Sequence, residues 1–181
     1  MHLLALSGSL RARSINTELL RAVALVAPAD THIRFSDHLA GLPHYNPDLD
    51  AEGMSPPEIV AQLRTAIAAA DAIVISSPEY AHGVAGAFKN LLDWLVSGPE
   101  LVGKPVCILS ASTGSRFGPA ALVETLRTMS AVVVTGDAIT VPVNGRRMDA
   151  TEMASDAELT STIGDVLASI ASAVRDAQTS R

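Results

Sequence analysis

Short apolar runs alternate with helical stripes along the 181-residue chain, and this alternation restricts the fold more than any other feature. Runs such as Leu3–Leu6 and Ala72–Ile75 are apolar throughout, which is typical of strands buried on both faces. Each run leads through a polar turn into apolar residues at helical spacing, as at Ile15, Leu19 and Val23. Repeated strand–helix units predict a parallel sheet covered by helices on both faces.

The predicted strands are residues 3–6, 32–35, 72–75, 106–109 and 132–134, alternating with five helices. His32–Phe35 alternates polar and apolar residues, which indicates a sheet edge with one wet face. This pattern favours an α/β, flavodoxin-like, doubly wound five-stranded parallel sheet of order 2-1-3-4-5, although periodicity alone permits other doubly wound orders. A chain of this length is expected to form one domain, residues 1–181.

Local signals predict where two helices begin. Ser14 is placed to cap the first helix, and Pro28 to end it. Ser55 and Glu58 stand at the spacing of a capping box for the second helix. Between these helices, Asp37–Met54 is rich in Gly, Pro and acidic residues without periodicity, so we expect a long surface loop that helps to cover the ligand edge.

Composition excludes several classes of protein. The net charge is -6 and the 13 basic residues are scattered, which argues against a nucleic-acid partner. No apolar stretch reaches the ~20 residues of a membrane span and no signal segment is visible, so a cytoplasmic protein is expected. The single cysteine, Cys107, lies in an apolar run and is expected in the core. The histidines show no paired ligand spacing, so no metal site is predicted.

Ligands of open α/β sheets bind beyond the carboxyl ends of the strands, where the winding direction reverses. Loops 7–16, 76–83 and 110–118 are expected to meet there. The first loop joins a buried strand to a helix N-terminus and carries Ser9, Arg11, Ser14 and Asn16, a set that suits a phosphate. On these residues alone, Ser14 acting only as a helix cap beside solvated arginines is an equally good interpretation.

The second loop continues into a helix with a more specific pattern. The pattern in this loop and helix comprises Pro78, Glu79, Tyr80, Gly86, Lys89, Asn90, Asp93 and Trp94. The first and third loops add Gly8-Ser9-Leu10-Arg11, Ser14, Asn16 and Ser112-Thr113-Gly114 to it. This pattern resembles the NADPH-dependent FMN reductase family, which includes quinone, chromate and azo-dye reductases. The chain has Ala81, Gly83 and Ala85 where the family pattern has Asn, Ser and Pro. The family's side-chain contacts from positions 81 and 83 are therefore in doubt for this chain.

The resemblance implies a bound FMN and a site for each of its parts. The phosphate is expected among Ser9, Arg11, Ser14, Ile15 and Asn16. The isoalloxazine is expected along Pro78, Glu79, Tyr80, Ala81, His82 and Gly83, and its pyrimidine end or the ribityl chain at Ser112 and Gly114. No catalytic side chain is implied, because the flavin carries the chemistry.

The resemblance also implies an activity: an NAD(P)H-dependent oxidoreductase that passes hydride from NADPH, or NADH, through FMN to a quinone, free flavin or other small acceptor. A homodimer or homotetramer is expected. Two alternatives stay open. One is a flavodoxin-type electron carrier, disfavoured because such carriers bracket the ring with aromatics and only Tyr80 is clearly placed here. The other is an α/β interaction module without a cofactor.

Individual residues in the second loop and its helix have competing interpretations. Tyr80 is expected beside the flavin, whereas His82 either contacts a ligand or is a loop residue without a role. Glu79 either meets a basic residue across a subunit interface or caps local backbone, and it is not expected to be an acid catalyst. Lys89, Asn90, Asp93 and Trp94 are expected to stabilise their helix or an interface.

Overall fold

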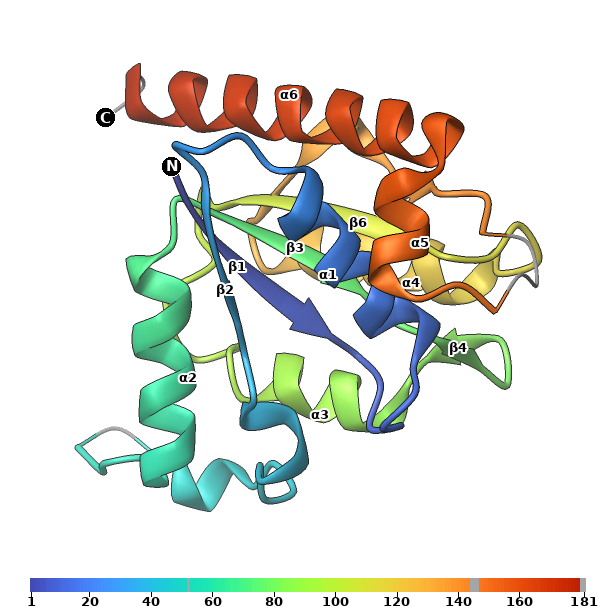
Figure 1. The fold of residues 1–181 in the computed structure, drawn as a ribbon. Helices are drawn as coiled ribbons and strands as arrows, with labels where there is room; N and C mark the ends of the chain where they lie inside the picture. The colour runs from blue at the N-terminus through green and yellow to red at the C-terminus, as the bar shows by residue number, and fades with distance from the viewer. Residues whose placement is uncertain (52, 144–146, 180–181) are drawn as a thin grey trace.

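A parallel β-sheet lies between two layers of helices in the computed structural model, which describes residues 1–51, 53–143 and 147–179 (Figure 1). The predicted α/β class is confirmed. The strands of the main sheet are β1 (His2–Ser7), β2 (His32–Phe35), β3 (Ala72–Ser76), β6 (Pro105–Ser110), β7 (Val132–Val133) and β8 (Ile139–Thr140). A separate two-stranded hairpin consists of β4 (Glu79–Tyr80) and β5 (Gly83–Val84).

The main sheet has the order β2-β1-β3-β6-β7, and β8 also pairs with β6. β2 lies at an edge, as predicted. The prediction of five strands was wrong, because two short strands pair with β6: Val133 lies opposite Val106, and Ile139 lies opposite Leu109. The short helix η3 (Val134–Gly136) separates them, and Thr135 within it has a φ of 64°. A left-handed residue of this kind interrupts an extended strand.

Six α-helices cover the sheet within the described residues. They are α1 (Ile15–Val26), α2 (Glu58–Ala69), α3 (Gly86–Asp93), α4 (Phe117–Thr128), α5 (Ala150–Ser155) and α6 (Ala157–Thr179). The predicted number, five, was wrong because α5 precedes α6 as a separate short helix. It begins with a capping box, in which Asp149 accepts a hydrogen bond from the Glu152 N–H and Glu152 accepts one from the Asp149 N–H.

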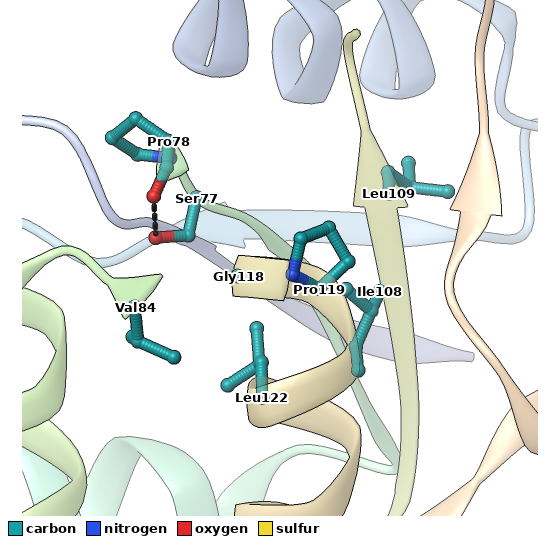
Figure 2. Close-up of a pocket in the computed structure, with 8 residues that line it drawn as sticks. All are labelled: Ser77, Pro78, Val84, Ile108, Leu109, Gly118, Pro119 and Leu122. Carbon is teal, nitrogen blue, oxygen red and sulfur yellow. Dashed lines mark hydrogen bonds between the residues drawn. The ribbon is translucent and has the colours of Figure 1, made fainter. Parts of the chain in front are cut away.

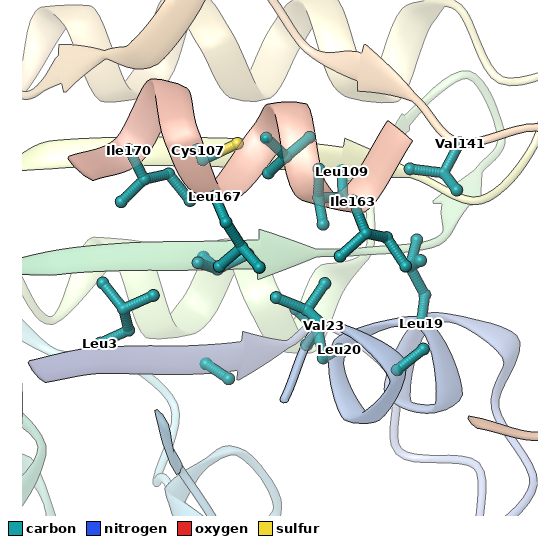
Figure 3. Close-up of a cluster of buried hydrophobic side chains, with 14 of the residues drawn as sticks. Leu3, Leu19, Leu20, Val23, Cys107, Leu109, Val141, Ile163, Leu167 and Ile170 are labelled. Atoms are coloured by element: carbon teal, nitrogen blue, oxygen red, sulfur yellow. The ribbon is translucent and has the colours of Figure 1, made fainter. Parts of the chain in front are cut away.

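One core lies between the sheet and the helices α1, α5 and α6 (Figure 3). Leu19 and Leu20 of α1 and Ile163 of α6 meet side chains of the strands there, including that of Cys107. Burial raises the pKa of the Cys107 thiol to about 12, so it stays neutral at physiological pH. The prediction that Cys107 is a core residue is confirmed.

A second core fills the space between the opposite face of the sheet and α2, α3 and α4. Successive residues of a strand point to opposite faces, so Ile73 and Ile75 belong to this core whereas Val74 belongs to the first. Burial on both faces explains why these strands are apolar at every position.

Of the two predicted N-terminal caps, Ser14 is confirmed in position and Ser55 was wrong. Ser14 is the N-cap residue of α1, but its side chain makes no capping hydrogen bond. α2 begins at Glu58 with Pro57 as N-cap, so Ser55 lies outside the helix and forms no capping box. The physical reason at α2 is that a proline drives the residue before it towards extended backbone, so Pro57 keeps Pro56 out of the helix and Ser55 cannot be its N-cap.

The loop between β2 and α2 carries the short helices η1 (His38–Ala40) and η2 (Pro47–Leu49); its residue 52 lies outside the described part. Two side chains of the segment around α3 hold this loop. Asn90 Nδ2 and Trp94 Nε1 both donate to the Pro43 carbonyl, at 2.9 and 2.8 Å. The Tyr45 ring packs edge-on against the Trp94 ring, with centroids 5.1 Å apart. Asn90 and Trp94 therefore stabilise a tertiary contact, while Lys89 and Asp93 form an ion pair along α3.

A charged network fixes the end of the same loop. Arg64 Nη2 of α2 donates to Asp50 Oδ2 at 2.8 Å and to the Trp94 carbonyl at 2.6 Å. The Ser97 hydroxyl also donates to Asp50. Burial by itself raises the pKa of Asp50, but the hydrogen bonds from Arg64 and Ser97 and the charge of Arg64 together lower it.

Among the described residues, no helix combines the length and the apolar character that crossing a membrane requires.

Candidate functional site

A cleft of about 220 Å³ opens at the carboxyl ends of β1, β3 and β6, where the three predicted loops meet. Predicted residues that line it are Ser9, Arg11, Ser14, Ile15, Asn16, Pro78, Glu79, Tyr80 and Ser112. Ser77, Ser110, Ala111 and Ser115 line it as well. Those four lay within the predicted loops but matched no motif, so only the rule that parallel strands share a carboxyl edge points to them.

Four predicted site residues lie beside the cleft rather than in its lining. Ala81, His82 and Gly83 lie at the turn of the β4–β5 hairpin, and Gly114 follows Ser112 in the third loop. The Gly114 N–H donates to Ser112 Oγ at 3.1 Å, which shapes that loop locally. Their contacts with a ligand stay predictions.

The first loop lies directly against the end of β3. The Gly8 N–H donates to the Ser76 carbonyl at 2.8 Å. A Cβ atom on Gly8 would lie 2.2 Å from Ser77 Oγ and 2.9 Å from Ser77 Cα, which is closer than non-bonded atoms approach. Glycine is therefore required here so that the first and second loops can form one wall.

Hydroxyl and amide groups form the polar floor beneath this loop. Ser76 Oγ donates to Asn16 Oδ1 at 2.9 Å in the interior, and Ser7 Oγ lies 2.8 Å from Thr17 Oγ1. Ser9 Oγ accepts the Arg11 N–H at 3.3 Å. Asn16 was predicted as a ligand contact; the Ser76 bond shows that it also ties α1 to β3.

The N-terminus of α1 is uncapped where it meets the cleft. Ser14 is only 4% exposed, and its side chain accepts no hydrogen bond from the first turn of the helix. The first N–H groups of a helix have no partner within the helix, and a buried end without a cap is unusual. Such an end, with the positive pole of the helix dipole, is a binding site for an anion.

The second loop forms a hairpin that the sequence did not predict. Tyr80 pairs with Gly83, and the two residues between them, Ala81 and His82, have φ values of 48° and 59°. Two positive φ angles are typical of the tight turn that joins two-residue hairpins, which favours Asn and Gly. Ala81 and His82 therefore occupy backbone conformations that their side chains disfavour.

Two contacts join this hairpin to the start of α4. Glu79 Oε2 accepts the Gly118 N–H at 2.8 Å, so Glu79 caps backbone, as one of its two predicted roles required. The His82 ring stacks on the Phe117 ring, with centroids 4.3 Å apart and planes 28° apart. Neither Gly118 as the partner of Glu79 nor Phe117 as the partner of His82 was predicted, because the partners lie in different loops.

Beneath the hairpin, apolar side chains pack it against α4 and β6 (Figure 2). The space left between them is about 10 Å³, roughly the size of a single water. Its lining comprises Ser77, Pro78, Val84, Ile108, Leu109, Gly118, Pro119 and Leu122. The hairpin is therefore packed on the body of the protein, and Ser77 and Pro78 line both this space and the cleft.

Comparison with known proteins assigns the family. The family model for NADPH-dependent FMN reductase matches residues 1–144. The chain belongs to this family. The match includes all three loops of the cleft and ends before α5.

Curated relatives of this FMN reductase family member match over shorter segments. An NAD(P)H-dependent FMN reductase of Pseudomonas aeruginosa is 42% identical over 119 residues, which are 65% of this chain and 62% of the relative. A quinone reductase of Escherichia coli is 37% identical over 116 residues, 63% of this chain and 61% of the relative. The matched part thus spans less than two thirds of either relative.

Solved structures show the fold of this family member. FerB of Paracoccus denitrificans, a flavoenzyme NAD(P)H:(acceptor) oxidoreductase, superposes with a TM-score of 0.68 at 24% identity over 98% of this chain and 97% of FerB. Oxidised flavodoxin 1 of Bacillus cereus gives a TM-score of 0.61 at 15% identity over 95% of this chain and 98% of the flavodoxin. The predicted flavodoxin-like fold is therefore confirmed.

Proposed function

We propose that the cleft binds FMN, with the phosphate at the N-terminus of α1. The observation that carries this proposal is the uncapped, buried start of α1, beside Ser14 and within a cleft that Ser9 and Arg11 also line. A phosphate there would accept the N–H groups that the protein leaves unpaired. The guanidinium of Arg11 would add a charge-assisted hydrogen bond.

The charged side chains around the cleft are compatible with this anion. Among the described lining residues, Arg11 is the basic side chain and Glu79 the acidic one. The Glu79 carboxylate is directed to Gly118 at the start of α4 and is engaged there. Repulsion between that carboxylate and a phosphate at α1 is thereby limited.

For the flavin ring we propose the wall formed by Pro78, Glu79 and Tyr80. Tyr80 lines the cleft and is 56% exposed, which leaves its ring available to a planar ligand. The polar edge of the ring is proposed to meet backbone groups of the segment 78–83 and the Ser112–Gly114 turn. Small residues at Ala81 and Gly83 are compatible with contacts made by backbone.

The proposed activity is NAD(P)H-dependent oxidoreduction with a quinone, free flavin or other small acceptor. Bound FMN would supply the acceptance and donation of hydride. The chain's residues then bind and orient the reactants, and no side chain is assigned the role of acid or base. Family membership and the names of the relatives, an FMN reductase and quinone reductases, support this class of reaction.

We further propose that residues 1–181 act as one FMN-binding domain and assemble as a homodimer or homotetramer. The family resemblance supports the assembly. Light scattering of the purified protein measures its mass directly, and a monomer at micromolar concentration would contradict this part of the proposal.

A visible spectrum and a reduction experiment test the function. Purified protein should carry, or take up, one FMN, and anaerobic mixing with NADPH or NADH should bleach the flavin absorbance. Protein that takes up no FMN would contradict the site. Bound FMN that neither nucleotide reduces would contradict the activity and favour the electron-carrier alternative.

A further inference from the structure

We propose that Glu79 is a positioning residue, which latches the β4–β5 hairpin to the N-terminus of α4 and so fixes the wall against which the flavin lies. This inference rests on the proposed FMN site. It concerns a contact between segments 39 residues apart in sequence, from the hairpin to the start of α4.

The hairpin cannot hold its own position. Each of its strands has two residues, and an isolated two-stranded ribbon is at best marginally stable. Its turn residues Ala81 and His82 both have positive φ, a conformation that is unfavourable for side chains with a Cβ. Contacts with α4 must therefore determine where Pro78, Glu79 and Tyr80 lie.

The hydrogen bond from Gly118 to Glu79 is the polar half of the latch. Gly118 lies in the first turn of α4, where N–H groups lack helical partners and the dipole favours a negative charge. The carboxylate oxygen Oε2 lies 2.8 Å from this N–H. Glu79 thus caps α4 from another loop.

Gly118 also makes the close approach of the two elements possible. A Cβ atom at this position would lie 2.9 Å from Glu79 Cβ and 3.2 Å from the Gly83 carbonyl oxygen. Both hairpin strands thus approach the start of α4 so closely that a side chain at Gly118 would crowd them.

The stack of His82 on Phe117 is the apolar half of the latch. Phe117 is 55% exposed, so the hydrophobic core does not account for its position, and its ring contact is with His82 at the hairpin tip. Glu79 holds the base of the hairpin and His82 holds the tip. Two points of attachment define its orientation, which a single point would not.

The test measures FMN affinity by quenching of flavin fluorescence in the full-length protein. Glu79→Ala should weaken FMN binding about tenfold, the effect of losing one hydrogen bond to a charged group. Glu79→Gln retains an oxygen acceptor and should bind within about threefold of the wild type. Glu124→Ala removes an exposed carboxylate from α4 and serves as the matched control, with unchanged affinity.

Two readouts separate positioning from general destabilisation. Visible circular dichroism of the bound flavin should change in Glu79→Ala and remain in Glu79→Gln. Hydrogen exchange at the Gly118 amide, measured without FMN, should accelerate in Glu79→Ala alone. Phe117→Leu, which removes the stack but keeps apolar bulk, should weaken FMN about threefold.

The proposal is overturned if Glu79→Ala binds FMN like the wild type with the same circular dichroism, or if Glu79→Gln is as impaired as Glu79→Ala. Unchanged FMN affinity in Phe117→Leu would show that the stack of His82 on Phe117 does not help to position the hairpin. If the wild type binds no FMN, the proposed function fails instead, and exchange at Gly118 then shows by itself whether Glu79 holds the hairpin.

Discussion

Two helices, α1 and α4, begin at the edge of the same cleft, and their N-termini differ in whether a side chain caps them. The first turn of α1 receives no hydrogen bond from the side chain of its N-cap residue, Ser14. The first turn of α4 receives a carboxylate, Glu79, from the neighbouring hairpin. Since both ends favour an anion, the difference would direct the phosphate of the proposed FMN to α1 and away from α4.

The helix α5 sharpens this contrast. Its N-terminus carries a complete capping box formed by Asp149 and Glu152, and the described cleft lining includes neither residue. Where the first N–H groups of a helix have no ligand to bind, neighbouring residues of the same segment can thus accept their hydrogen bonds. The start of α1 lacks this local solution at the position where the family resemblance puts a phosphate.

The largest expected effect comes from making α1 resemble α4. Ser14→Asp would place a carboxylate at the uncapped end, where it would repel a phosphate and occupy the free N–H groups. FMN binding should weaken at least about 100-fold, because two like charges about 4 Å apart interact by a few kcal/mol in a partly buried site. The protein without FMN should melt higher, by a gain of about 0.5–1 kcal/mol from the dipole. Fluorescence titration and thermal melts measure both.

Ser14→Ala is the matched control for this experiment. It removes the hydroxyl without adding charge and should weaken FMN far less than Ser14→Asp does. Equal affinities for Ser14→Asp and the wild type would show that the phosphate does not lie at α1.

The next largest effect is expected on the stability of the fold, away from the N-termini of α1 and α4. Asp50→Asn breaks the network with Arg64 and Ser97 and should lower the free energy of unfolding by about 2 kcal/mol, with FMN affinity unchanged. The pKa of Asp50 is lowered in the folded protein, so its contribution is present above its ordinary pKa of 3.8 and is lost as the pH falls through the folded value. Urea unfolding of both proteins from pH 7 to pH 3 should show the difference shrink below about pH 4. A difference that stays constant, or a weakened FMN complex, would contradict this.

Arg11→Ala should have a smaller effect, on the ligand alone. Loss of one charge-assisted bond to the phosphate should weaken FMN about tenfold and reduce the salt dependence of binding. Arg13→Ala removes the same charge from the same loop at a position outside the cleft lining and is the matched control. Titrations at low and high salt measure FMN affinity and its salt dependence. Equal losses of affinity in the two variants would indicate general electrostatic attraction by the loop rather than a direct contact of Arg11 with the phosphate.

The smallest effect is expected at the hairpin turn. Ala81→Asn restores the residue of the family pattern, and asparagine tolerates the positive φ of 48° better than alanine. Stability should rise by about 0.5 kcal/mol, with little change in FMN affinity. Chemical denaturation measures this gain, and a loss of stability would mean that the turn is not strained at position 81.

Periodicity and turn chemistry predicted much of the fold and the place of the site. The runs at β1, β3 and β6 are apolar because each strand is buried on both faces, and the stripes of α1 and α6 repeat because one side of each helix packs on the sheet. The three loops then had to meet, since parallel strands share their carboxyl edge. Those signals are local, so they can be recognised in a single sequence.

Predictions of ends and edges failed more often, because several solutions compete there. Ser14 and Ser55 have the right residue type for caps, yet neither caps a helix through its side chain. The strand predicted at 132–134 ends at Val133, where the left-handed Thr135 redirects the chain and β8 resumes the pairing. The start of α5 does carry a local signal, because Asp149 and Glu152 stand at the spacing of a capping box.

The sequence by itself determined the alternation of strands and helices, the family and the loops of the cleft. Only the tertiary structure decided which helix N-terminus stays open, since the Glu79 carboxylate reaches Gly118 across 39 residues of chain. The pairing of His82 with Phe117 was decided in the same way. The physical reason is that periodicity follows from which faces are buried, whereas a specific hydrogen bond or ring contact depends on how elements far apart in sequence are brought together in space.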